Sequence, residues 1–384
     1  MKTRLITVAA LLASTVSAGA VGLDRSGQRV GVLFETGNHA EVTLSFTNPT
    51  LEGSVSNPFF AGLPDSGNVA DTFRSLSGAI KYDINDKWSV ALIGDEPFGA
   101  DIFYENGPAA SALGGTGATV DSYAITALAR YKFTDRWSVH GGLRYQEVSA
   151  NVSLGGVAFQ GLSGFNAAFA SDGDVGYVIG GAFEIPEIAL RVALTYNSST
   201  THDLETTETI NGVGTSTLTG GLLGDTSRTS VDTPESINLA FQTGVATNTL
   251  VFGSIRYARY SGTIVEPAFF TGIASPGNAL TDLEDGFDVE LGVGRRFNEK
   301  WSGSVAVGFS TVGDDNLVSP LTPTNGSRYI SVGAKYDANE KFAISGGVRY
   351  TSLGSAFSSP GGTPIAFFDG NDAVTLGVKL AFKF

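Results

Sequence analysis

The sequence contains no cysteine, few histidines, and charged residues at only 16% of its 384 positions. The chain can therefore form no disulfide, and His39, His140 and His202 are too scattered for a zinc site of ordinary ligand type. No phosphate-binding loop, nucleophile elbow or complete dinucleotide fingerprint occurs, so we expect no metal, no cofactor and no enzymatic activity. A serine and a histidine distant in sequence could still meet in space, which leaves a catalytic site as the weaker alternative.

Long hydrophobic runs are also missing after the N-terminus. Residues 1–20 begin with basic side chains, continue through an apolar run from Leu5 to about Val16, and offer small residues at Ala18 and Ala20. This pattern predicts a secretory signal peptide. No later run reaches the roughly 18 residues that a membrane helix needs. If the mature chain enters a membrane, it must do so as a closed barrel, because only helices and closed barrels satisfy every backbone polar group in lipid.

Basic residues are the minority. The chain has 24 Lys and Arg against 38 Asp and Glu, and its net charge is −14. Nucleic acid phosphates require a basic surface, so we expect no nucleic acid partner. The chain holds 50 glycines and 10% aromatic residues, which favours many short strands joined by glycine-rich turns.

One motif occurs four times: a polar turn, then a basic residue, then an aromatic residue that begins an apolar run. A soluble protein could bury such aromatic residues, but aromatics just beyond short turns at regular intervals are typical of the girdle at a membrane interface. The copies are KYDINDKWSV from Lys81, RYKFTDRWSV from Arg130, RRFNEKWSG from Arg295 and KYDANEKFAI from Lys335, with Trp88, Trp137, Trp301 and Phe342 in the aromatic slot.

Apolar and polar residues alternate in the segments between these turns, as in FDVELGVG from Phe287 and in the last strand up to Phe384. Alternation alone fits both a soluble sandwich and a membrane barrel. Six short turns, however, alternate with seven long connections of unequal length, which is the pattern of outer-membrane barrels. We therefore predict an all-β fold, with residues 39–384 forming a transmembrane antiparallel β-barrel of about fourteen strands with long external loops.

Residues 21–38 precede the first clear strand and do not resemble another full membrane strand. Val30, Val32, Leu33 and Phe34 would be poorly placed in water. We expect this segment to form a short hatch that lines or plugs the barrel, the alternative being a loose N-terminal tail.

Phenylalanine is unusually frequent in the predicted external loops, where apolar side chains are costly to expose. These side chains must pack on one another, dip into lipid or line a site for an apolar ligand, and we expect part of them to form a capture site at the mouth of the barrel. The candidates are Phe59, Phe60, Phe159, Phe165, Phe269, Phe270, Phe367 and Phe368.

The stretch GDEPFGAD, residues 94–101, interrupts a strand that begins at Trp88. Proline cannot donate to a β-ladder and glycine often marks a bulge, so Pro97 and Gly99 predict a local break in strand pairing. A strand ending there would be shorter than the roughly 9–11 residues that span a bilayer. We therefore expect the strand to continue through ADIFY, with Asp95, Glu96 and Asp101 turned toward the lumen or the gap.

The stretch DKWSVALIGDEPFGADIFYENG, with TVDSYAITALARYKFTDRWSVHGGLRYQEVSANVSL after it, resembles the FadL/TodX family of outer-membrane transporters for long-chain fatty acids and other hydrophobic compounds. The resemblance implies a lateral opening at Pro97, Phe98 and Gly99, an N-terminal hatch, and recognition of the terminal Phe384 by the barrel-insertion machinery. The chain departs from the family in its short hatch and in the missing Asn-Pro-Ala motif; Asn48-Pro49-Thr50 lies after the first strand instead.

These observations predict a monomeric channel of the bacterial outer membrane, in contact with its lipid, that takes up a hydrophobic small molecule by passive diffusion. Long-chain fatty acids and other apolar compounds fit equally. The alternatives are a general porin for polar solutes and a structural barrel or surface receptor. Cations that could meet a ligand carboxylate, or pair with carboxylates of the chain itself, are Arg25, Arg29, Arg144, Arg256, Lys335, Arg349 and Lys379.

Overall fold

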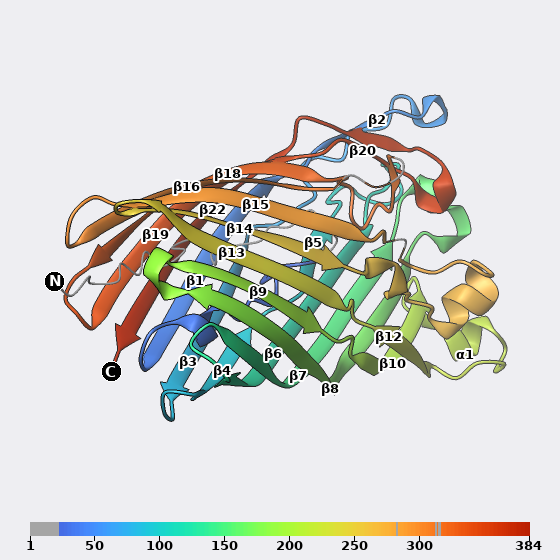
Figure 1. The fold of residues 1–384 in the computed structure, drawn as a ribbon. Coiled ribbons are helices and arrows are strands. Elements are labelled where there is room, and N and C mark those ends of the chain that lie inside the picture. Colours follow the sequence, from blue (N-terminus) through green and yellow to red (C-terminus); the bar gives the residue numbers. More distant parts are fainter. Residues whose placement is uncertain (1–22, 282, 312, 314–315) are drawn as a thin grey trace.

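A computed structural model describes residues 23–384 apart from residues 282, 312 and 314–315, so the predicted signal peptide lies outside the described residues. The described residues form a closed antiparallel wall in which the first strand, β1 (His39–Thr50), pairs with both the second and the last strand (Figure 1). Counting interrupted strands once, the wall has fourteen strands, and the predicted barrel is confirmed. No helix among the described residues has the length and apolar character needed to cross a membrane.

Three wall strands consist of two halves: β4 (Trp88–Asp95) with β5 (Gly99–Phe103), β9 (Leu190–Asn197) with β10 (Thr201–Ile210), and β12 (Thr226–Asp232) with β13 (Ser236–Ala246). The other wall strands are β3 (Phe73–Asp83), β6 (Gly117–Lys132), β7 (Trp137–Leu154), β8 (Phe165–Ile185), β14 (Thr249–Ala258), β15 (Gly286–Arg296), β16 (Trp301–Ser310), β18 (Ser327–Asp337), β19 (Phe342–Leu353) and β22 (Asp372–Lys383), and β11 (Val213–Gly214) extends the sheet beside β10.

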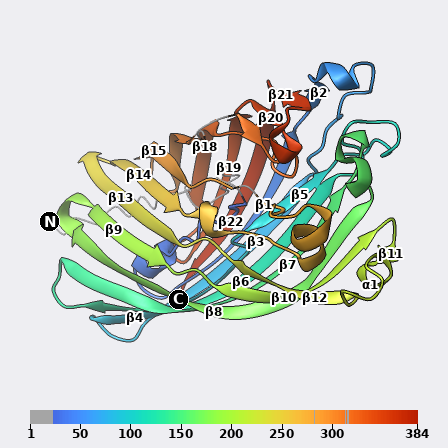
Figure 2. The ribbon, with the colours of Figure 1, turned by 90° about the vertical axis from the view of Figure 1, so that its right-hand side faces the viewer.

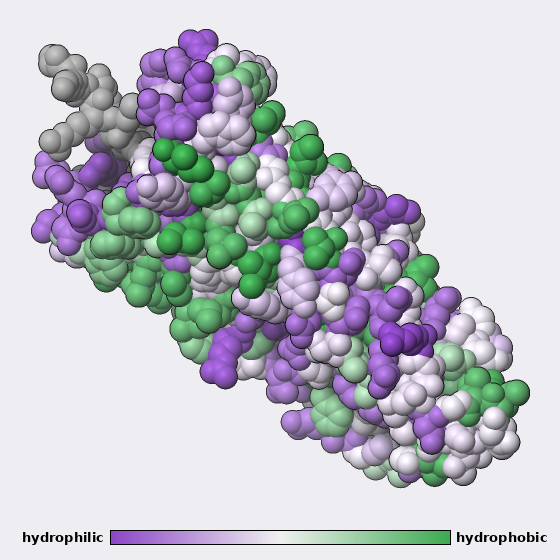
Figure 3. All heavy atoms as spheres, turned by 90° about the horizontal axis from the view of Figure 1, so that it is seen from below, coloured by the Kyte–Doolittle hydropathy of each residue, from purple (hydrophilic) through white to green (hydrophobic). Residues whose placement is uncertain are grey.

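The apolar residues of the wall face outward and the polar residues face inward, which is the reverse of a soluble sandwich. On β1, Val42, Leu44 and Phe46 are exposed, whereas Thr43 and Ser45 are buried. Apolar side chains gather into a broad area on the face shown in Figure 3, with polar residues at the adjoining end of the molecule. Alternation with this polarity matches a lipid-facing surface around a polar interior.

Asn and Thr side chains build the four repeated turns. In the first turn, the Asn85 side chain accepts hydrogen bonds from the backbone N–H groups of Lys87 and Trp88. Thr134, Asn298 and Asn339 do the same in the other three copies. Each turn therefore delivers its aromatic residue to the start of a strand, and the three tryptophans of the chain, Trp88, Trp137 and Trp301, are all exposed.

The long connections gather at the end of the barrel opposite the C-terminus (Figure 1). They carry a second, four-stranded sheet made of β2 (Gly53–Val55), β17 (Leu317–Val318), β20 (Ala356–Ser358) and β21 (Ala366–Phe368). Figure 2 shows the wall curving around the interior. Short helices complete the chain: η1 (Gly31–Phe34), η2 (Pro58–Phe60), η3 (Val157–Leu162), η4 (Pro186–Ile188), α1 (Thr215–Leu218), η5 (Tyr260–Gly262), η6 (Phe270–Ala274) and η7 (Pro360–Gly362).

Candidate functional site

The wall has a window between β3 and the interrupted third strand. The β3–β4 ladder ends at the pair Gly78 and Gly94, and β5 then pairs with β6 on its other side. Beyond the window, an isolated bridge between Ala70 and Ile102 closes the wall again. We call the space between residues 73–77 and residues 96–100 the window. The strand is thus interrupted where Pro97 and Gly99 predict a break, and it resumes as expected.

The N-terminal segment, Leu23–Asn38, pairs with the break from the inside. The backbone N–H of Gly99 donates to the carbonyl of Leu23, and the N–H of Arg25 donates to the carbonyl of Pro97, both at 2.8 Å. Phe98 is buried, and its ring meets Tyr260 edge to face with centroids 6.4 Å apart. The break therefore turns into the lumen, where the N-terminal segment supplies the backbone partners that β3 does not.

Buried polar contacts anchor the first part of this segment to the opposite wall. Asp24 forms an ion pair with Arg256 of β14. The Gln28 side-chain oxygen accepts a hydrogen bond of 2.9 Å from the Ser236 hydroxyl of β13. On the side of the break, the Ser26 hydroxyl donates to the buried Asp95. Partners of this kind are required wherever charged groups are removed from water.

The second part of the segment is apolar. The four predicted hatch residues are all buried and pack with inward-facing residues of β4, β6, β8 and β9. Two guanidinium groups lie over the Phe34 ring, with Cζ of Arg130 at 4.6 Å and Cζ of Arg191 at 4.9 Å from its centroid. His140 meets the same ring edge to face at 5.7 Å. The residues concerned are Val30, Val32, Leu33 and Phe34.

A cavity of about 240 Å³ lies between this segment and the wall. It extends from Phe34 and Arg191 to β13–β15 on one side, and to Ser75, Leu76 and Glu96 at the window on the other. Among described residues, the cations that line it face carboxylates of the chain. Arg256 pairs with Asp24, and Lys379 pairs with Glu41. Carboxylates also act electrostatically on the other three cations: Glu96 on Arg25, Asp288 on Arg29, and Glu35 on Arg191.

The remaining predicted cations are also engaged. Arg144 donates to Thr126 and Asn197, and Lys335 pairs with Asp337 at 3.0 Å. Arg349 pairs with the buried Glu290 at 3.0 Å. Intramolecular hydrogen bonds engage Arg144, and ion pairs engage Lys335 and Arg349, without a ligand carboxylate.

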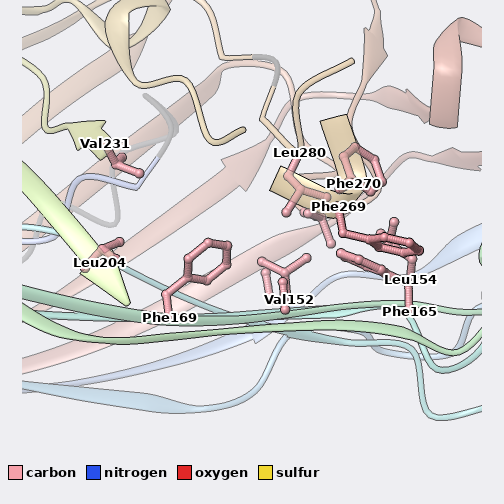
Figure 4. Close-up of a cluster of buried hydrophobic side chains, with 12 residues drawn as sticks. Val152, Leu154, Phe165, Phe169, Leu204, Val231, Phe269, Phe270 and Leu280 are labelled. Carbon is pink, nitrogen blue, oxygen red and sulfur yellow. The ribbon is translucent and has the colours of Figure 1, made fainter. Parts of the chain in front are cut away.

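The predicted capture phenylalanines lie in two clusters at the long-loop end, and the structure does not bring all of them into one site. The first, which we call the mouth cluster, joins Phe165 and Phe169 of β8 to Phe269 and Phe270 of the loop after β14, with the Phe165 and Phe270 rings 5.2 Å apart (Figure 4). Phe165 and Phe169 belong to β8 rather than to a loop, because this strand continues past the lipid-facing part of the wall.

The second, which we call the rim cluster, forms around the small second sheet. Phe368 is fully buried against Tyr104, and Phe60 packs at its edge. The Phe367 ring packs against Phe357 at a tilt, with centroids 4.6 Å apart, whereas Phe159 packs against both clusters. Phe59 differs from all of these, because 89% of its surface is exposed.

A buried carboxylate fixes the loop that carries Phe269 and Phe270. The two oxygens of Glu208, on β10, accept hydrogen bonds from the backbone N–H groups of both phenylalanines at 2.8 Å. Burial raises the pKa of Glu208, and the two N–H donors oppose that shift. The loop is thus tied to the strand at the point where its aromatic rings enter the mouth cluster.

Sequence reasoning missed the polar anchors of the N-terminal segment. It singled out the apolar run 30–34 but assigned no role to Asp24, Ser26 or Gln28, whose partners lie far along the chain. The only signal was the density of polar residues in DRSGQR, residues 24–29, in a segment expected inside a barrel. Among the described residues, no group of His, Asp and Glu is arranged to hold a metal ion.

Three solved structures share this architecture. The chain matches a Pseudomonas aeruginosa FadL homologue with a TM-score of 0.70 and 14% identity, covering 96% of both chains. It matches the Pseudomonas putida toluene transporter TodX with a TM-score of 0.61 and 10% identity, covering 98% of this chain and 96% of that one. It matches the Ralstonia pickettii toluene transporter TbuX with a TM-score of 0.59 and 13% identity, covering 92% of this chain and 90% of that one. Identities this low establish the fold alone.

No curated protein matches the sequence. The family model described as outer membrane protein transport protein (OMPP1/FadL/TodX), in contrast, matches residues 38–363, which is most of the chain. The resemblance noted in the sequence is therefore confirmed: the chain belongs to the OMPP1/FadL/TodX family of outer-membrane transport proteins.

Proposed function

We propose that this protein takes up hydrophobic small molecules across the outer membrane by passive diffusion and releases them sideways through the window. One observation carries the proposal: the internal cavity extends to a break in the wall where the N-terminal segment supplies the backbone hydrogen bonds that β3 does not. TodX and TbuX, which share the fold, are toluene transporters. Long-chain fatty acids and smaller apolar compounds both remain within the proposed substrate class.

Burial provides the driving force for capture. Removing apolar surface from water is worth about 25 cal/mol per Å², so a hydrophobic molecule gains free energy on leaving water for the barrel. The exposed Phe59 offers a first apolar contact at the long-loop end, and the buried mouth cluster becomes available to a ligand when the loop after β14 moves. The bilayer beyond the window also removes the apolar surface of the ligand from water, and it lacks the polar groups that line the lumen. Transport therefore needs no nucleotide or ion gradient, because the ligand moves toward an apolar solvent.

The N-terminal segment acts as the hatch of this path. It fills the lumen beside the cavity and donates and accepts the hydrogen bonds that stabilise the break. A shift of residues 23–28 would uncouple the break from the segment and connect the cavity with the window. The hatch thereby links occupancy of the cavity to release.

Uptake of a labelled hydrophobic compound by cells that lack their own transporter tests the proposal. The variant replaces Pro97-Phe98-Gly99 by Val-Thr-Val, which removes the break. The matched control makes the same replacement at Thr233-Pro234-Glu235, the interruption between β12 and β13. We expect the first variant to lose uptake and the control to retain it, with equal amounts of both inserted in the membrane.

Two outcomes contradict the proposal. Uptake that survives removal of the break would place the exit elsewhere in the barrel. If the native protein supports no uptake of a fatty acid or of toluene, but conducts ions steadily in planar bilayers, the protein is a porin for polar solutes.

A further inference from the structure

Two side chains cross the window. The Arg25 guanidinium stacks on the Phe73 ring of β3, with Cζ 4.3 Å from the ring centroid. On the other edge it lies against Gly99 of β5, so closely that a Cβ on Gly99 would collide with Nε and Cζ of Arg25. Glu96 reaches across in the opposite direction, toward the Ser75 hydroxyl and the Leu76 backbone. Arg25 therefore spans the space where a ladder between β3 and β5 is missing.

Charge holds Arg25 in this position. The carboxylates that act on it are Glu96, Asp101 and Asp121, and Asp71 lies close to Asp101 at the upper edge of the window. Three carboxylates on the break, β5 and β6 thus act on this one guanidinium. Without it, the attraction between these carboxylates and a cation stacked on β3 is lost, and Asp71 on the β3 side still repels Asp101 across the gap, so its removal favours separation of the two edges.

We propose that Arg25 is the bolt of the window: it closes the wall when the N-terminal segment is docked and leaves the window when that segment moves. The backbone of Arg25 is bonded to Pro97, and its neighbour Asp24 is paired with Arg256 across the lumen. A displacement of the segment therefore removes the Arg25 side chain from the window and breaks its backbone hydrogen bond to Pro97 at the same time. This inference rests on the proposed function for its transport consequence, but the position of the bolt can be tested without transport.

Gly99 is part of the same device. A larger residue at this position would occupy the space of the Arg25 side chain. The φ angle of Gly99 is not positive, so alanine is compatible with its backbone. Replacing Gly99 by alanine should therefore displace Arg25 from the window while keeping its charge in the protein.

The absence of cysteine permits a clean assay. Ser77→Cys places a single thiol on β3, facing the cavity beside the window. The purified full-length protein is reconstituted in phospholipid vesicles, and the rate of reaction with a lipid-soluble maleimide is measured. A charged maleimide added from water reports access through the lumen, and Ser304→Cys, a buried position on β16, is the matched control thiol.

We expect Arg25→Ala to raise labelling of Cys at position 77 by the lipid-soluble reagent about tenfold, the effect of losing one stacked and partly desolvated guanidinium. Gly99→Ala alone should do the same, and adding it to Arg25→Ala should change nothing further, because both act on one side chain. Arg25→Lys should give an intermediate rate. The control thiol should not respond.

Unchanged labelling in Arg25→Ala would overturn the proposal, as would full additivity of the two substitutions. Equal acceleration at position 304 would also overturn it, because that result means general loosening of the barrel. If the bolt is confirmed but the Val-Thr-Val variant still transports, lateral release fails while the inference about Arg25 stands.

Discussion

Replacing Phe34 by alanine should release the second part of the hatch. Phe34 is only 8% exposed and packs among buried residues of the wall. Phe-to-Ala changes at such sites cost about 3–5 kcal/mol. Each guanidinium on the ring contributes about 0.5–2 kcal/mol, partly counted within the same range. We therefore expect the free energy of local opening of residues 30–35 to fall by about 3–5 kcal/mol, which is roughly 150-fold to 5,000-fold in the opening equilibrium.

Native-state hydrogen exchange of the hatch peptide measures this quantity, because exchange of its amides requires local opening. The reporters are the N–H groups of Leu33 and Glu35, which donate to Val30 and Val32 at 3.1 Å. Phe59→Ala is the control, since it removes the same atoms from an exposed site. If the two amides keep their protection in Phe34→Ala, the polar contacts of Asp24 and Gln28 hold this segment in place, and the packing of Phe34 does not.

Three other changes probe the long-loop end. Glu208→Gln leaves one acceptor oxygen for two N–H groups, so the loop after β14 should lose about 1–3 kcal/mol and exchange faster. Burial raises the pKa of Glu208 in the folded protein. Its contribution to stability is therefore fully present below its unfolded pKa and is lost as pH rises through its folded pKa. Unfolding by guanidinium chloride at several pH values should show this dependence in the native protein and not in Glu208→Gln. Phe270→Ala should destabilise the mouth cluster by about 3–5 kcal/mol, whereas Phe59→Ala should change stability by less than about 0.5 kcal/mol, both measured by the same unfolding assay. Gly53→Ala places a Cβ inside the van der Waals radius of the Phe368 ring and should destabilise the rim cluster by about 1–3 kcal/mol, with faster exchange of β2 and β21 as the measurement.

The fold was predictable because its signals are local. Alternation with period two, and turns closed by Asn85 and its equivalents, are encoded within a few residues. The break at Pro97 was predictable for the same reason. The site was not, because its contacts join residues that are far apart: Asp24 and Arg256 are separated by 232 positions. The sequence also predicted Phe165 in a loop, although it begins β8. Where a strand extends beyond the membrane into water, its outer face is no longer apolar, so the alternation that identifies a membrane strand is lost.

The three interruptions in the wall differ in their hydrogen bonds, and the difference supports the proposed gate at Pro97. At the breaks after β9 and β12 the wall stays closed, because the Thr233 N–H donates to Thr200 at 2.9 Å and the Ser198 N–H donates to Tyr177 at 3.0 Å. β9 and β10 also pair with neighbours on both sides, whereas β5 pairs with β6 alone apart from one bridge. A break bonded to neighbouring strands needs separation of the wall to open. The break at Pro97 is held by Ser122 of β6 and by the backbone of the N-terminal segment, and the described ladder between β3 and β4 ends before it. In the proposed mechanism, movement of the N-terminal segment frees the side of the break that faces β3, which requires no separation of paired wall strands.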